Sequence, residues 1–412
     1  MPISRTLLVS SLLIVTAAAC ARPQDTPAVT EPSLQPKSGG QFSARADQDP
    51  YDWDITYTGK TAPMGDSLGL AYDSLLSFKS GPGIKHTEMV LQPRLAERWQ
   101  ASPDGKTFTF NLRKGAKYAN QPPVNGREVT SADVKFSYEY QTRTGDLDKK
   151  GLPEGQMSWM FEGMKKIDIP DRHTVVVSFE EPFVPFLSYA ASEWTPIMPR
   201  EIFEQDGHFK DKILGSGPYQ LDRAASQQTT RWVFKKNPDY WDAGKPYLDE
   251  IRWIVLRDEA AELAAFQSKQ LDVVQDLSYR EAEDMKKAQP NAGTFEYTNP
   301  LGYRFFVSQV RKGPMNDFRV RKALDLAMDR DEILRTVSGG RGRWSMPGVF
   351  PDMFTDEEAR RYIKHDPEEA KKLLAQAGFE KGVELEWIIV NNESATNMAW
   401  IQLVQASSRR SG

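Results

Sequence analysis

Residues 95–113, with the sequence LAERWQASPDGKTFTFNLR, are the stretch that decides the fold most clearly. Two strand-like segments, 95–99 and 106–113, flank a Pro103-Asp104-Gly105 turn, and this order is typical of a β-hairpin. The second segment has large apolar side chains at every second position, at Phe108, Phe110 and Leu112. That spacing puts them on one face of a strand. The stretch therefore predicts a hairpin with one apolar face.

The chain beyond the hairpin carries both helix and strand patterns. Thr130 and Asp133 form a helix-start signature, and the helix is expected to run to about residue 140. Strand patterns follow farther along, at 174–179, 231–235 and 251–256. Because strands and helices alternate without a fixed repeat, the sequence predicts an α/β or α+β protein and not a solenoid.

Three later helices begin with an aspartate at the N-cap position, namely Asp258, Asp317 and Asp366. The first is expected to extend through residue 266. The second carries one apolar stripe, expected to consist of Val320, Ala323, Leu324, Ala327 and Met328. The third has a proline in its first turn and ends at a glycine, and its stripe consists of Ala370, Leu373, Leu374 and Ala377.

Composition limits the classes of function. The 412 residues include 53 basic and 57 acidic side chains, a net charge of −4, and 39% are hydrophobic. A chain of this length with this share of hydrophobic residues can form the cores of two or three domains. Its positive and negative charges are dispersed, which gives no reason to expect nucleic acid as a partner. Because Cys20 is the sole cysteine and the four histidines lack zinc-site spacing, we expect no metal centre and no cofactor.

The motifs do not form a recognisable catalytic site. The glycine cluster at 339–342 lacks the strand and helix that flank a phosphate loop, so a structural turn is expected there. Ser216, within the glycine-rich stretch 215–219, is not set in the pattern of a nucleophile elbow. Adjacent acidic pairs such as Glu180-Glu181 point in different directions and do not converge. We therefore expect a protein that is not an enzyme, with an exported hydrolase as the alternative class.

The N-terminal residues have the features of an export signal. Arg5 precedes an apolar run that ends in Ala17-Ala18-Ala19, directly before Cys20. The run is shorter than the roughly 20 residues that span a bilayer. Residues 1–19 are therefore predicted to be a signal peptide. Residues 20–47, which are rich in Pro, Ser, Thr, Gln and Gly, are predicted to be a flexible tether.

A cysteine directly after small residues resembles the lipobox of bacterial lipoproteins. The resemblance implies that Cys20 becomes the mature N-terminus and carries lipid, whereas ordinary signal cleavage would leave a free exported thiol. We expect lipidation at Cys20. The protein would then lie in the periplasm or on the exterior of the cell envelope, anchored to a membrane through its lipid.

Several segments together resemble the family 5 extracellular solute-binding proteins, the peptide, dipeptide and nickel class of ABC-transporter substrate-binding proteins. In chain order they are 95–115; 130–139; 215–219 with 237–241; 318–323 with 328–330; and 366–378. One such segment would be a weak signal, but five in the expected order are specific. The resemblance extends over roughly residues 48 to 405.

The resemblance implies a two-lobed α/β fold like that of class II periplasmic binding proteins, with an extra inserted domain. By analogy, the domains are expected at 48–75 with 196–258 (domain I), 76–195 (domain II) and 259–412 (domain III). It also implies a monomer that captures a peptide or other small solute between its lobes and delivers it to ABC transporter permease subunits. Binding of an oligosaccharide or a metal chelate is the alternative within this class.

Ligand contacts are expected from six residues. The resemblance places Tyr303 on a segment that crosses toward the cleft, and Trp387, Asn391 and Asn392 at a cleft loop. Trp344, after a turn that follows a helix, and Trp194, at an expected domain junction, complete the set. The residues after 405 do not resemble the continuation of the family's next helix. We therefore expect a chain truncated at its C-terminus, with an incomplete second lobe. The acidic residue that binds a peptide's amino group in relatives is then expected beyond residue 412.

Overall fold

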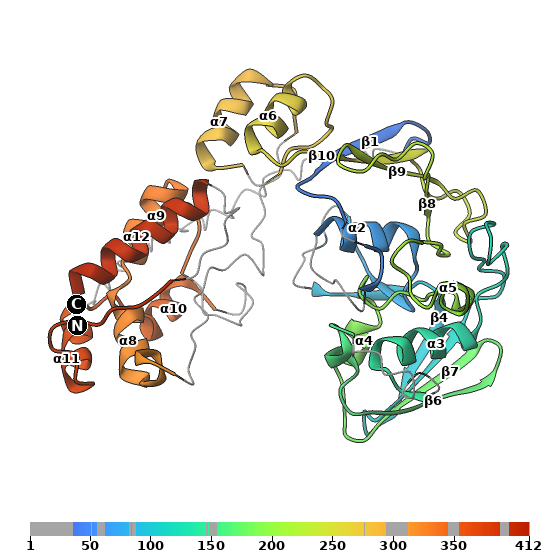
Figure 1. Cartoon of the computed structure of the whole chain (residues 1–412), viewed down its shortest axis with the longest axis horizontal. Helices are drawn as coiled ribbons and strands as arrows, with labels where there is room; N and C mark the ends of the chain where they lie inside the picture. The colour runs from blue at the N-terminus through green and yellow to red at the C-terminus, as the bar shows by residue number, and fades with distance from the viewer. Residues whose placement is uncertain are drawn as a thin grey trace, which may run out of the picture. The chain divides into compact units, whose positions relative to one another are not determined.

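The computed structural model describes residues 36–50, 52–55, 62–81, 84, 88–145, 147, 155–275, 277–293, 312–344, 354–387 and 395–411. The chain divides into two compact units, residues 1–37 and 38–412. Every helix and strand given below lies in the second unit (Figure 1). The export signal and Cys20 lie outside the described residues.

One four-stranded sheet has the order β1-β10-β9-β8. Its strands are β1 (Gln41–Ala46), β8 (Tyr219–Leu221), β9 (Arg231–Lys236) and β10 (Glu250–Val255). β1 runs parallel to β10, and the other neighbours are antiparallel. The prediction of a tether through residue 47 is therefore wrong for residues 41–46. The small side chains Ser43, Ala44 and Ala46 are buried there, and they give little hydrophobic signal in the sequence.

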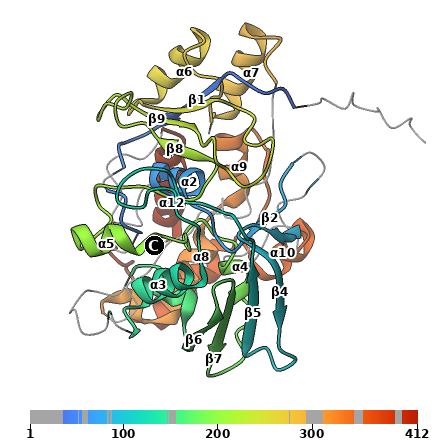
Figure 2. The same ribbon diagram turned by 90° about the vertical axis from the view of Figure 1, so that its right-hand side faces the viewer.

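A second four-stranded sheet, β4-β5-β7-β6, is antiparallel throughout (Figure 2). It consists of β4 (Ala96–Ala101), β5 (Thr107–Leu112), β6 (Met164–Asp171) and β7 (Thr174–Phe179). β4 and β5 form the predicted hairpin, and β7 has the predicted bounds. Two short strands, β2 (Leu76–Phe78) and β3 (Leu91–Pro93), pair with each other.

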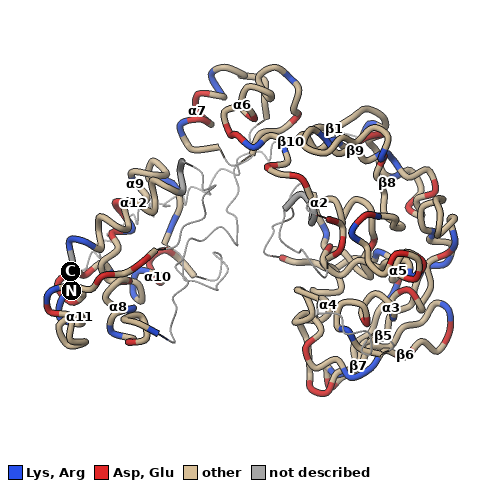
Figure 3. Tube along the Cα trace, in the orientation of Figure 1, with Lys and Arg blue, Asp and Glu red and all other residues tan. Residues whose placement is uncertain are grey.

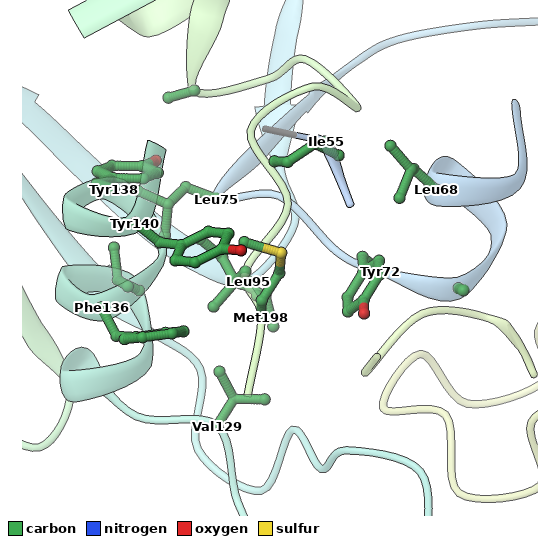
Figure 4. Packing of buried hydrophobic residues seen from close by; sticks show 14 of the residues in the cluster. Ile55, Leu68, Tyr72, Leu75, Leu95, Val129, Phe136, Tyr138, Tyr140 and Met198 are labelled. Carbon is green, nitrogen blue, oxygen red and sulfur yellow. The ribbon is translucent and has the colours of Figure 1, made fainter. Parts of the chain in front are cut away.

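The helices that accompany these sheets are α2 (Ala62–Ala71), α3 (Ser131–Thr142), η3 (Ser158–Phe161), α4 (Phe186–Tyr189) and α5 (Arg200–Asp206). Thr130 and Asp133 form the predicted capping box of α3. One hydrophobic core joins these elements and both four-stranded sheets, from Trp53 to Phe234. Figure 4 shows Phe136, Tyr138 and Tyr140 of α3 in this core.

Two helices follow the last strand, α6 (Glu259–Gln267) and α7 (Tyr279–Ala288). The Asp258 side chain caps α6 as predicted, accepting a hydrogen bond from the Ala261 N–H at 2.9 Å. β1 is tied to this segment, because the Ser43 N–H donates to Asp272 Oδ2 at 2.7 Å and Arg45 pairs with the buried Glu262 at 2.9 Å.

The remaining elements are helical: η4 (Pro314–Asn316), α8 (Phe318–Ala327), α9 (Arg330–Ser338), α10 (Asp356–Tyr362), α11 (Pro367–Gln376) and α12 (Ala395–Ser411). α8 and α11 pack together around a small core. The prediction of the apolar stripe on α8 is right for some of its residues and wrong for others. Leu326 is buried, whereas Leu324 and Met328 are only half-buried. The expectation that residues 406–411 do not continue the helix is also wrong, since α12 extends to Ser411.

Candidate functional site

The buried carboxylate of Asp73 accepts hydrogen bonds from two motifs identified in the sequence, 215–219 and 237–241. Asp73, fully buried, follows α2 and accepts hydrogen bonds from four side chains, which we call the Asp73 cluster: Arg94, Ser216, Tyr240 and Trp241. Arg94 Nε lies 2.6 Å from Asp73 Oδ1, and the Ser216 hydroxyl and the Trp241 indole N–H each donate to Oδ2 at 3.0 Å.

The electrostatics of the cluster favour the charged state of Arg94. Burial by itself lowers the pKa of Arg94, but the interactions with Asp73 and Tyr240 together more than offset that effect, so the pKa is raised above its ordinary value. Burial raises the pKa of Tyr240, and the negative charge of Asp73 raises it further. The Asp73 cluster is therefore a buried salt bridge with surrounding neutral donors.

The glycines of the 215–219 stretch are required by the same packing. A Cβ at Gly215 would lie 1.9 Å from the carbonyl oxygen of Ala71, and one at Gly217 would lie 2.6 Å from the carbonyl oxygen of Leu70. The Gly217 N–H donates to the Ala71 carbonyl at 2.9 Å. The stretch leads into β8. These contacts pack the backbone of the 215–219 stretch directly against the backbone at the end of α2. They do not form a nucleophile site.

The predicted ligand contacts do not converge on one site among the described residues. Tyr303, Asn391 and Asn392 lie outside them. Trp194 is half-buried against the large core, and its backbone N–H donates to the Ser192 hydroxyl oxygen at 3.2 Å. The other two tryptophans line two different hollows.

Trp344 sits in a small core with Ala359 and Ile363. Its indole N–H donates to Asp331 Oδ1 at 3.0 Å, and its backbone N–H donates to Asp356 Oδ1 at 2.9 Å. The Arg360 guanidinium lies over its ring at 4.2 Å and also binds Asp331. The hollow beside these residues measures about 400 Å³. These contacts fix α9 against α10.

Trp387 lines the larger hollow, of about 720 Å³, which is within the range of small-ligand pockets. We call it the α8–α12 groove. Its wall comes from α8 and α11, from residues 381–387 and from α12: Val320, Ala323, Leu324, Ala327, Leu374, Lys381, Gly382, Val383, Glu384, Leu385, Trp387, Gln405, Ser408 and Arg409. The wall is apolar along α8 and polar along α12, so the groove suits an occupant with both kinds of surface.

The described residues lack a cluster of side chains suited to a metal ion. They contain no group of three or more His, Cys, Asp or Glu side chains that could hold a metal ion. In Figure 3, acidic and basic residues are interspersed along the elements that are drawn in colour. None of the described helices has the length and apolar character needed to cross a membrane.

The similarity to known proteins covers most of the chain. Residues 90–412 match the model for bacterial extracellular solute-binding proteins, family 5 Middle. The chain belongs to this family. The family 5 chain is 29% identical to the dipeptide-binding protein of Escherichia coli strain K12 over 382 residues. That match covers 87% of the chain and spans 66% of the relative.

Two solved structures place the fold of the family 5 chain among the two-lobed periplasmic binding proteins. The protein AgaA from A. tumefaciens R10, in complex with agropinic acid, is 25% identical with a TM-score of 0.73, and 90% of this chain and 71% of that chain are covered. DppA from Helicobacter pylori, in complex with the peptide STSA, is 23% identical with a TM-score of 0.72, at 91% and 73% coverage. The predicted fold class and family are confirmed.

Sequence reasoning missed the Asp73 cluster. The motifs 215–219 and 237–241 were recognised, but Asp73 has no motif of its own and its partners are distant in sequence. The only signal was an acidic residue between Tyr72 and Ser74, two positions after the end of α2. The domain boundaries and the six ligand contacts stay predictions.

Proposed function

We propose that this chain is the extracytoplasmic solute-binding component of an ABC importer. It captures a peptide-like solute between its two lobes and delivers that solute to the permease. The observation that carries the proposal is the family match over residues 90–412, since family 5 consists of non-enzymatic solute-binding proteins. The dipeptide-binding relative and the H. pylori protein in complex with STSA support a peptide as the solute.

Solute capture requires no covalent chemistry, only a binding surface that forms hydrogen bonds and buries apolar groups. The ligand contacts proposed from the family remain Tyr303, Trp344, Trp387, Asn391, Asn392 and Trp194. Of these, Trp387 has the environment that best suits contact with another molecule, because it lines a large hollow. The contacts of Trp344 with Asp331, Asp356 and Arg360 support a packing role instead.

A second class of solute deserves the same test. The structure of AgaA with agropinic acid shows that a protein of similar fold takes a solute other than a peptide. We therefore choose a panel of dipeptides, the tetrapeptide STSA, agropinic acid, an oligosaccharide and a nickel chelate. Each is titrated into the full chain by isothermal calorimetry, and the recovered solute is analysed by mass spectrometry.

The expected result is saturable 1:1 binding of at least one dipeptide or STSA, with the solute recovered intact. Release of cleaved product would identify a hydrolase and overturn the proposal. Tight binding of agropinic acid, the oligosaccharide or the chelate in place of the peptides would retain solute binding and overturn the peptide assignment.

We also propose that the protein is held at the membrane through lipid on Cys20. Two acyl chains give stable anchoring, because each buried methylene contributes about 0.8 kcal/mol and one myristoyl chain is marginal. Cys20→Ser should therefore release the protein from the membrane fraction into the soluble extract, as followed by immunoblot. A Cys20→Ser protein that still sediments with membranes after a salt wash would place the anchor elsewhere.

A further inference from the structure

An exposed tryptophan marks a patch of aromatic side chains at the surface of the large core. Of the ten tryptophans, all of them within the described residues, Trp159 of η3 alone is exposed, at 52%. Its ring packs edge-to-face against Tyr189 of α4, with ring centroids 5.3 Å apart, and Tyr189 lies 5.9 Å from Phe183. Val184, the next residue, is 73% exposed. We call Trp159, Phe183, Val184 and Tyr189 the Trp159 patch.

The backbone beneath the patch is held by hydrogen bonds between separate stretches of chain. The Phe183 N–H donates to the Gly105 carbonyl at 3.0 Å, and the Glu180 N–H donates to the Gly163 carbonyl at 2.9 Å. Phe183 also packs against the buried Phe179, with ring centroids 5.0 Å apart. A surface that is already fixed in this way loses little conformational freedom when it binds a partner. Exposed tryptophan and tyrosine side chains are also the ones that most often dominate interface energies.

The charge around the patch is negative. In the stretches 102–106, 157–163 and 180–189 the acidic residues are Asp104, Glu162, Glu180 and Glu181, all exposed, and Lys106 is the one basic residue. Lys106 Nζ is already engaged, at 3.0 Å from Glu181 Oε2 and 2.8 Å from the Glu180 carbonyl oxygen. Among the described residues, no basic side chain forms an ion pair with any of the other three acidic side chains.

This charge distinguishes among the molecules that could cover the patch. An anionic lipid surface attracts basic segments and would be repelled by these carboxylates. A second copy of the chain, in a two-fold symmetric contact, would bring the same acidic side chains together. A partner with basic residues gains from the carboxylates instead. Its arginine side chains can also stack on the open tryptophan ring, which is the strongest aromatic partner for a cation.

We propose that the Trp159 patch binds an arginine-bearing segment of another protein. The guanidinium groups of that segment meet the acidic residues around the patch, and its apolar side chains cover Phe183 and Val184. None of the patch residues is among the six proposed ligand contacts. The proposal therefore does not depend on which solute the chain captures.

The probe is a short, fluorescently labelled peptide that alternates arginine and leucine and is capped at both ends. Its binding to the full chain is measured by fluorescence anisotropy. Saturable binding is expected, and it should weaken as salt is added, because salt screens exposed charges. The same peptide with glutamate in place of arginine should bind about tenfold more weakly or worse. Each titration is repeated with an excess of the free dipeptides of the solute panel, which should not compete.

Matched variants locate the binding site. Trp159→Ala should weaken binding of the arginine peptide by about tenfold or more. Tyr362→Ala removes an aromatic side chain that is 68% exposed on α10 and should leave binding unchanged. Glu162→Lys should narrow the preference for the arginine peptide over the glutamate peptide. Glu380→Lys makes the same change in net charge at another exposed position and should leave that preference as it is.

Four outcomes would overturn the proposal. The first is that the arginine peptide does not bind to a chain that circular dichroism shows to be folded. The second is that Tyr362→Ala weakens binding as much as Trp159→Ala does, or that free dipeptides displace the peptide, which would place it at the solute site. The third is sedimentation with phosphatidylglycerol vesicles that depends on Trp159, which would identify a lipid surface. The fourth is a dimer in analytical ultracentrifugation that Trp159→Ala abolishes, which would identify a second copy. A negative result in the solute panel leaves these measurements unaffected.

Discussion

Asp73 is hydrogen-bonded to side chains from both the 215–219 and the 237–241 motifs. It accepts hydrogen bonds from a guanidinium, two hydroxyls and an indole N–H on three separate stretches of chain, and none of these donors is near it in sequence. Removal of one partner of a buried ion pair leaves a charge without compensation, which costs far more than the net contribution of the pair. A small change at Asp73 should therefore destabilise the folded state strongly.

Asp73→Asn should lower the free energy of unfolding by about 3–5 kcal/mol, because Arg94 stays charged and largely buried. The measurement is amide exchange in β9, which pairs with β8, the strand that follows the 215–219 stretch. Asp168→Asn is the control, since Asp168 forms an exposed ion pair with Lys166, and its effect should be within about 0.5 kcal/mol. A loss below 1 kcal/mol for Asp73→Asn would show that the cluster does not stabilise the fold as an ion pair.

At the scale of elements, local patterns predicted those helices and strands that carry their own signals. The β4–β5 hairpin, α3 with its capping box, and the helices that begin after Asp258, Asp317 and Asp366 all follow from short-range chemistry. β1 was missed, because its buried side chains are small and its pairing partner β10 is some 200 residues away. The Asp73 cluster was missed for the same reason, since it depends on long-range contacts.

The packing of α9 against α10 depends on the ionisation of Asp331. Hydrogen bonds from Arg360, and then from Trp344, hold the pKa of Asp331 below its usual value of 3.8. A carboxyl whose pKa is lower in the folded state stabilises that state above its unfolded pKa, and the stabilisation is lost as pH falls through the folded value. The contact between the two helices should therefore weaken below about pH 4.

The indole N–H resonance of Trp344 reports this change. Between pH 7 and pH 2 its signal should shift toward the solvent-exposed position and its exchange should accelerate below about pH 4. In Asp331→Asn the signal should already be altered at pH 7 and change less with acid. Glu357→Gln, which removes an exposed ion pair with Arg361, is the control and should titrate like the unmodified chain. A pH-independent resonance in the unmodified protein would contradict this prediction.

At the scale of the whole molecule, the hydrophobic cores are very unequal. The large core extends from Trp53 to Phe234 and contains many fully buried aromatic side chains. The core between α8 and α11 and the one around Trp344 consist of a few residues each. Because burial of apolar area is the main stabilising contribution, about 25 cal/mol per Å², small cores give segments that open at low free energy.

We therefore expect residues 312–411 to be cleaved in limited proteolysis, and to exchange amide hydrogens, before the elements of the large core. Leu374→Ala tests whether the two regions are independent. Leu374 is almost fully buried between α11 and α8, so its truncation should cost about 2–5 kcal/mol locally. If α8 and α11 open as a separate unit, Leu374→Ala accelerates exchange there and leaves α3 and β7 unchanged. Equal acceleration in α3 would show that the large and small cores unfold together, and that core size does not set the order in which this chain opens.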